Sequence, residues 1–152
     1  SGADGFMAKE DKAKLDGIPP NPRYLAVDWV NPRVIYSSST QASNSGSTFN
    51  VAKTTTLTLT KDLARIRISF DMWCNISNRP MAWRLKVDTN IVATGTVQYS
   101  ETPVHVSSTI SIVPYTDGAS HSVTLECAMS GYIDTWYIDD FVLEAPEILP
   151  LF

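Results

Sequence analysis

The feature that most constrains the fold is a two-residue alternation of apolar and polar side chains from Ala64 to Ile76. Every even position of this segment is apolar, and the odd positions carry Arg, Ser or Asp until Trp73 interrupts the polar series. Because successive side chains of a β-strand point to opposite sides, the pattern predicts a strand with one buried and one exposed face. Trp73 is then expected on the exposed face, where folding alone gives no reason for a large aromatic ring.

Similar segments follow one another at intervals of about ten residues, with turn-forming residues between them. The predicted strands are Tyr24–Val30, Val34–Ser38, Thr54–Thr60, Ala64–Ile76, Met81–Val87, Ile91–Tyr99, Val104–Val113, Ser122–Met129 and Thr135–Leu143. The sequence offers no second long helix to cover a sheet, so a second sheet must do so. We therefore predict an all-β fold, an antiparallel β-sandwich of the jelly-roll type. Its predicted core residues are Phe70, Met72, Trp83, Leu85, Val123 and Leu125.

The composition is that of one ordinary folded domain. The 152 residues are 43% hydrophobic and 18% charged, with a formal net charge of −4. These values suffice for one hydrophobic core and argue against disorder. The Lys and Arg residues form no concentrated basic cluster, so we expect no nucleic-acid partner. No run approaches the roughly 20 apolar residues that cross a bilayer, so we expect no membrane insertion.

Residue patterns for catalysis are scarce. His105 and His121 lie outside any nucleophile or metal motif, and no phosphate-binding glycine loop is present. We therefore expect a protein that is not an enzyme and that requires no cofactor. Cys74 and Cys127 fall on the apolar faces of their strands. They could meet across a sandwich, but we expect two buried thiols.

A short charged segment from Gly5 to Ile18 precedes the strands and favours a helix of one or two turns. The run Pro19-Pro20-Asn21-Pro22 cannot continue that helix and is typical of an extended spacer. We therefore divide the chain into a stalk-like helical element with its spacer, residues 1–22, and a β-sandwich domain, residues 23–152. A helix this short is not stable alone in water, so we expect it to pack against other copies of the chain. The alternative is a solvated, frayed helix.

This segment, G-F-M-A-K-E-D-K-A-K-L-D-G-I, resembles an element of bacteriophage tail-fibre and head-fibre proteins, where it precedes a distal domain of a trimeric fibre. That family usually has Ser where this chain has Ala8, so the helix lacks that N-terminal cap. The resemblance implies a parallel homotrimer located in the virion, with apolar side chains near the threefold axis. Those residues are Phe6, Met7, Leu15 and Ile18. The opening Ser1-Gly2 is typical of a cloning remnant, so we expect the natural chain to extend upstream.

The last predicted strand carries a second resemblance. The run I-D-T-W-Y-I-D-D-F-V-L-E, residues 133–144, is similar to the closing strand of carbohydrate-binding modules with a galactose-binding-type jelly roll. Such modules often hold a structural Ca²⁺ through an Asp of this strand, which implies Asp139 or Asp140 as a ligand. Strict alternation places these two aspartates on opposite faces of the sheet. The alternative is a solvated or hydrogen-bonded carboxylate.

Aromatic residues are the main candidates for a ligand site. Trp73 is expected on an exposed face, and one of the neighbours Trp136 and Tyr137 must also face outward. Exposed aromatic rings provide flat apolar surfaces for the C–H faces of a sugar. Asn75 and Arg79 belong to the adjoining turn and could add hydrogen bonds. The alternative is that these rings fill the interface between subunits.

The combined expectation is a distal domain of a phage fibre that binds a host-surface glycan without cleaving it. A fibre or capsid-decoration module with a purely structural role is the alternative. A glycan-cleaving enzyme ranks third, because paired carboxylates would have to face each other across a cleft.

Overall fold

The computed structural model describes residues 24–75, 78–130 and 134–150, and it describes side chains between residues 29 and 147 apart from the two gaps. The predicted N-terminal helix and the domain boundary lie outside the described residues, as do the residues predicted near a threefold axis, Phe6, Met7, Leu15 and Ile18. Within the described part, helical structure is limited to two 3-10 turns, η1 (Lys61–Leu63) and η2 (Val113–Tyr115). No helix there is long and apolar enough to span a membrane.

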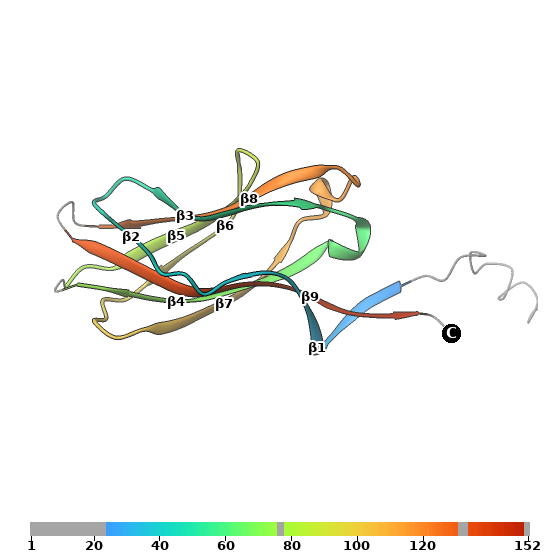
Figure 1. Cartoon of the computed structure of the whole chain (residues 1–152), viewed down its shortest axis with the longest axis horizontal. Helices are drawn as coiled ribbons and strands as arrows, with labels where there is room; N and C mark the ends of the chain where they lie inside the picture. The colour runs from blue at the N-terminus through green and yellow to red at the C-terminus, as the bar shows by residue number, and fades with distance from the viewer. Residues whose placement is uncertain (1–23, 76–77, 131–133, 151–152) are drawn as a thin grey trace, which may run out of the picture.

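The described strands form two antiparallel sheets that face each other (Figure 1). Sheet A consists of β1 (Tyr24–Ser38), β2 (Ala42–Ser45), β4 (Arg65–Cys74), β7 (Val104–Ser111) and β9 (Thr135–Pro150). Sheet B consists of β3 (Asn50–Thr58), β5 (Met81–Val87), β6 (Asn90–Val97) and β8 (Ser120–Met129). Sheet A has the order β1-β9-β4-β7 with β2 also paired to β9, and sheet B has the order β3-β8-β5-β6. The predicted antiparallel β-sandwich is thus confirmed.

The space between the sheets is filled by the apolar faces that the alternation predicts. All of the predicted core residues are buried, with at most 5% of the residue surface exposed. Phe70 of sheet A meets Trp83 of sheet B edge to face, with ring centroids 5.6 Å apart, which is a favoured geometry for aromatic pairs. Cys74 and Cys127 are buried free thiols, as expected. Burial raises the pKa of the Cys127 thiol, so this cysteine is inert and serves packing.

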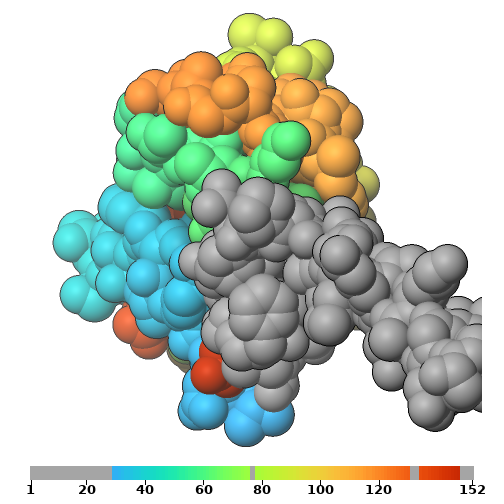
Figure 2. Space-filling model, turned by 90° about the vertical axis from the view of Figure 1, so that its right-hand side faces the viewer, coloured from blue at the N-terminus to red at the C-terminus, as the bar shows by residue number. Residues whose placement is uncertain are grey.

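The two layers can be followed from the end of the molecule (Figure 2). The green and orange residues around β3 and β8 form the upper layer in this view, and the blue residues of β1 lie in the lower layer. Beyond the sandwich body, β1 and β9 continue as a two-stranded ribbon (Figure 1). The apolar C-terminal residues up to Pro150 therefore extend β9.

The first two predicted strands are one strand. In β1, Asp28 pairs with Glu147 and Arg33 pairs with Ala145, so residues 29–32 are accommodated between consecutive pairs with β9. The turn-forming pair Asn31-Pro32 lies in this irregular stretch. Because proline cannot donate a ladder hydrogen bond, it interrupts the pairing here without reversing the chain.

Candidate functional site

The rings of Trp73 and Tyr137 lie against each other on the outer face of sheet A. The two residues are direct partners across β4 and β9, and their rings stack with centroids 5.5 Å apart and planes 15° from parallel. Both side chains are half-buried, whereas the flanking Met72 and Cys74 point into the core. We call Trp73 and Tyr137 the aromatic platform. The outward position predicted for Trp73 is thus confirmed.

Trp136 does not belong to this platform. Its side chain is fully buried on the core face of β9, so the prediction that it forms part of an exposed binding surface is wrong. The reason is the alternation of β9, because Trp136 shares its phase with the buried Ile138, and Tyr137 shares its phase with Asp139. Within the described part of the chain, Trp136 Nε1 is a buried nitrogen without a hydrogen-bond partner.

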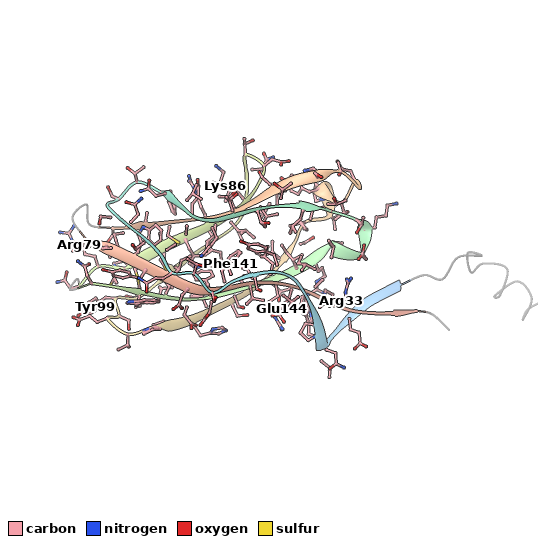
Figure 3. The ribbon with its side chains drawn as sticks, in the orientation of Figure 1. Arg33, Arg79, Lys86, Tyr99, Phe141 and Glu144 are labelled. Carbon is pink, nitrogen blue, oxygen red and sulfur yellow. The ribbon has the colours of Figure 1, made fainter. Side chains whose placement is uncertain are left out.

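Asn75 closes the strand pair beside the platform. Its backbone N–H donates to the Thr135 carbonyl oxygen at 3.0 Å, and its Oδ1 accepts from the Thr135 N–H at 2.8 Å. These bonds extend the pairing of β4 with β9 by one residue, so the Asn75 side-chain oxygen is already engaged. Arg79 is exposed in the connection between β4 and β5, at the same end of the sandwich as Tyr99 (Figure 3). Asn75 therefore lies at the end of the strand pair that carries the platform, and a role of Asn75 and Arg79 in ligand binding stays a prediction.

The carboxylates of Asp71, Asp139 and Asp140 gather on the same face, with oxygen atoms within 4.8 Å of one another. We call them the acidic triad. The prediction that alternation separates Asp139 from Asp140 is wrong because β9 contains a β-bulge. Asp71 pairs with Asp139 but Ser69 pairs with Val142, so the partner strand has one extra residue.

The bulge is visible in the backbone of Asp140, whose φ of 50° lies in the left-handed region. Asp and Asn tolerate this conformation better than most residues. The extra residue restores the inward direction at Phe141, which is 1% exposed, and leaves both aspartates facing out. Asp71 was not a predicted site residue, because its place opposite Asp139 depends on the register of two strands that are far apart in the sequence.

Burial raises the pKa of Asp139, and the neighbouring carboxylates of Asp140 and Asp71 raise it further. Two basic side chains lie near this charge. His105 Nδ1 lies 2.9 Å from Asp71 Oδ1. Lys53, whose pKa is lowered by burial, donates from Nζ to Ser38 Oγ at 3.0 Å and to the Thr40 carbonyl oxygen, and its charge acts on Asp139 from there. Clustered carboxylate oxygens are donors that Ca²⁺ accepts, so the residues that could hold a cation here are those of the triad.

A hollow of about 380 Å³ lies beside the triad. It is lined by Ser37, Ser38, Ser39, Asp140, Phe141 and Val142. Strand β9 pairs with β2 up to Ile138 and with β1 from Phe141 onward, so the bulge sits where one neighbour gives way to the other. Sequence reasoning missed the hollow because it depends on how the end of β1 pairs with the bulged part of β9, which local periodicity does not show.

Two antiparallel sheets in this strand order define a jelly roll. A CBM4 structure is similar to this chain with a TM-score of 0.51 at 16% identity, over 76% of this chain and 78% of that chain. The CBM22-1 xylan-binding domain of Paenibacillus barcinonensis Xyn10C is similar with a TM-score of 0.49 at 14% identity, over 76% of this chain and 96% of that chain. TmCBM61 in complex with β-1,4-galactotriose is similar with a TM-score of 0.44 at 12% identity, over 76% of this chain and 89% of that chain.

No family model matches the sequence, and no curated protein matches it. The similarity to the CBM4 structure therefore concerns the fold, which is the jelly roll of carbohydrate-binding modules.

Proposed function

We propose that this chain is the receptor-binding domain of a bacteriophage fibre and that it binds a host-surface glycan on the outer face of sheet A. The observation that carries the proposal is the aromatic platform. Trp73 and Tyr137 expose apolar ring surface where the strand pattern calls for polar residues. Such rings bind the C–H faces of sugars, and the polar groups around them supply directional hydrogen bonds.

The proposal is one of binding and not of catalysis. The jelly roll is shared with the CBM4 structure, which is named as a carbohydrate-binding module. The carboxylates of the triad lie together on one face of sheet A, whereas glycoside hydrolysis uses two carboxyl groups that flank the scissile bond. This arrangement supports a surface that holds a sugar and does not cleave it. A function without a cofactor stays our prediction, with a Ca²⁺ ion on the triad as the alternative.

The fibre part of the proposal rests on the run from Gly5 to Ile18 and its resemblance to phage fibre proteins. In the proposed homotrimer, Phe6, Met7, Leu15 and Ile18 lie near the threefold axis. Three copies would raise a weak sugar affinity through avidity without any new contact. Light scattering on the intact chain should give a trimer mass at micromolar concentration, and a monomer mass would contradict the assembly.

The structural alternative also has an observation in its favour. Val30 and Val34 of β1 are 78% and 60% exposed, which is unusual for neighbouring apolar residues on one strand. Exposed apolar surface of this kind often contacts another subunit. In this alternative the platform would contact a second copy of the chain and no sugar.

The deciding experiment replaces Trp73 by Ala and measures binding on a printed glycan array. The expected result is loss of glycan binding with an unchanged mass and a thermal midpoint lowered only slightly, because the ring is half-exposed. Tyr99→Ala is the matched control, since Tyr99 is a 41% exposed aromatic residue at the same end of the sandwich but outside the platform. Dissociation of the Trp73→Ala protein into monomers would support the structural alternative. Retained binding in an intact fold would contradict the proposed site.

A further inference from the structure

The stacking of Trp73 on Tyr137 leaves each ring with one uncovered face. The two ring planes are 15° from parallel and the centroids are 5.5 Å apart, so the rings overlap face to face in an offset stack. A ring face that packs against another ring is not available to a sugar. A ligand that stacks on the platform therefore has two outer faces to choose from. One is the face of Trp73 on the β7 side of β4, and the other is the face of Tyr137 on the β2 side of β9.

The two outer faces have different neighbours. The direct partner of Tyr137 across β9 and β2 is Ser43, an exposed residue whose side chain is too short to cover an aromatic ring. On the other side, the connection between β6 and β7 borders the end of β4 that carries Trp73. The Ser100 carbonyl oxygen in this connection accepts a hydrogen bond from the Cys74 N–H at 2.9 Å. The open aromatic face of the platform is therefore that of Tyr137.

Hydrogen-bonding groups lie on both sides of this open face. Ser45 Oγ and Thr135 Oγ1 are 2.7 Å apart, and each residue is two positions from the pair Ser43 and Tyr137 on the same face of the sheet. Residues two apart on a strand lie about 7 Å from each other, within reach of a sugar ring seated on Tyr137. One hydroxyl of this pair donates to the other, so the second O–H and the remaining lone pairs are left for the hydroxyls of a ligand. Asp139, two positions beyond Tyr137, can accept from sugar hydroxyls as well.

The open face of Tyr137 has no aromatic successor along the sheet. In the described parts of β4 and β9, the outward positions past the platform carry no further aromatic ring. The next ring on this face is that of Trp29, which has the Arg67 guanidinium over it, 4.6 Å from the ring centroid. Arg67 is about 20 Å from Trp73 along β4. Tyr99, in the connection on the Trp73 side, is separated from the Tyr137 face by Trp73 itself. A glycan chain therefore meets a single stacking position here.

Resting on the proposed glycan function, we propose that the domain recognises one neutral pyranose residue, stacked on the open face of Tyr137 beside Ser43. Its affinity is then independent of the length of the glycan chain. Trp73 is a positioning residue, because its ring supports Tyr137 from the side that the sugar does not use. Ser45 and Thr135 bind hydroxyl groups of the sugar. The ligand class is a short or terminal neutral epitope of a host glycan.

The first test compares soluble ligands of increasing length, so that avidity plays no part. Methyl glycosides of glucose, galactose and mannose are titrated into the full chain by calorimetry or ligand-observed NMR, together with oligosaccharides of the same sugars up to the tetrasaccharide. The methyl glycoside that binds should do so within about threefold of its tetrasaccharide, because only one residue is stacked. An affinity that rises more than about tenfold over this series would overturn recognition of a single residue.

The second test blocks the open face. Ser43→Phe places a ring beside Tyr137 and should weaken binding at least about tenfold at an unchanged thermal midpoint. Ser107→Phe is the matched control, because Ser107 is an exposed serine on the same sheet face, on the edge strand β7, and should keep wild-type affinity. Trp73→Phe keeps a stacked ring behind Tyr137 and should restore most of the binding that Trp73→Ala loses. This rescue is expected of a positioning residue.

The possible failures separate this inference from the function on which it rests. Binding that survives Ser43→Phe but not Trp73→Ala would move the sugar to the Trp73 face and overturn the assignment. Equal losses in Ser43→Phe and Ser107→Phe would overturn it too, because any added ring would then have the same effect. Binding restricted to charged glycans would overturn the neutral class while leaving the glycan function intact. Binding to no soluble ligand and to no glycan on an array would contradict the proposed function itself.

Discussion

The inner and outer faces of β4 and β9 show how packing and binding make different demands on one pair of strands. On the inner face, Met72 and Ile138 are fully buried, and every position of β4 in phase with Met72 is apolar. On the outer face, the same strands carry Trp73 and Tyr137 beside Asp139, an arrangement that no packing rule requires. A regular pattern therefore marks the part of the strand that stabilises the fold, and departures from it mark the candidate site.

The largest expected effect is on the inner side of the sandwich. Leu85→Ala should lower the free energy of unfolding by about 2–5 kcal/mol, because Leu85 is fully buried and its loss leaves a cavity. Chemical denaturation measures this value. The control Ile91→Ala truncates a 51% exposed residue of the neighbouring strand and should cost less than about 0.5 kcal/mol. Equal losses in the two variants would erase the distinction between the inner and outer surfaces.

The inner face could be predicted from the sequence almost completely. Alternation alone identified the strand at Ala64–Ile76, the buried phases of Ala64–Ile76, Met81–Val87 and Ser122–Met129, and the outward direction of Trp73. The choice between Trp136 and Tyr137 could not be made from alternation, because Asp140 is in phase with Trp136 and Asp139 is in phase with Tyr137.

The acidic triad could not be predicted in the same way. A β-bulge depends on how two strands far apart in sequence pair, so residues 139 and 140 alone do not reveal it. Strand β2 was not predicted, for a related reason. Ala42–Ser45 is short and polar and is a strand only because β9 lies beside it. The site thus arises from pairing irregularities, whereas the core arises from local periodicity.

A second difference between interior and exterior is sensitivity to pH. His121 lies between two carboxylates, with Nδ1 2.7 Å from Asp88 Oδ2 and Nε2 2.7 Å from Asp117 Oδ1. Its hydrogen bonds to Asp117 and Asp88 raise the pKa of His121, and the same bonds lower the pKa values of both aspartates. The contribution of His121 is complete below its ordinary pKa of about 6.5 and is lost as pH rises through the raised value. The contributions of the aspartates are present above about pH 4 and are lost as pH falls.

We therefore expect this cluster to stabilise the fold most between about pH 4 and pH 6.5. His121→Gln should lower the thermal midpoint in this range and have less effect at alkaline pH. Thermal unfolding of both proteins across the pH range measures the difference. The stability loss of Leu85→Ala should be independent of pH over the same range, because no charge is involved. A constant difference between His121→Gln and the wild type would show that His121 contributes packing and no charge.

The smallest expected effect concerns the buried indole nitrogen of Trp136 on the inner face of β9. Trp136 is fully buried, yet its Nε1 lacks a hydrogen-bond partner among the described residues. A buried N–H without a partner costs about 1–3 kcal/mol, so Trp136→Phe removes that cost while it loses some packing volume. The two effects should nearly cancel, and the free energy of unfolding should change by less than about 1 kcal/mol. Trp83→Phe is the matched control. Trp83 is also buried, but its Nε1 is not a buried nitrogen without a partner, so this variant should simply be less stable. A loss for Trp136→Phe as large as that for Trp83→Phe would show that the Trp136 N–H is bonded in solution, with a buried water as the partner. The Trp136 N–H would then be hydrogen-bonded, as buried polar groups normally are, and the inner face would differ from the outer face more clearly.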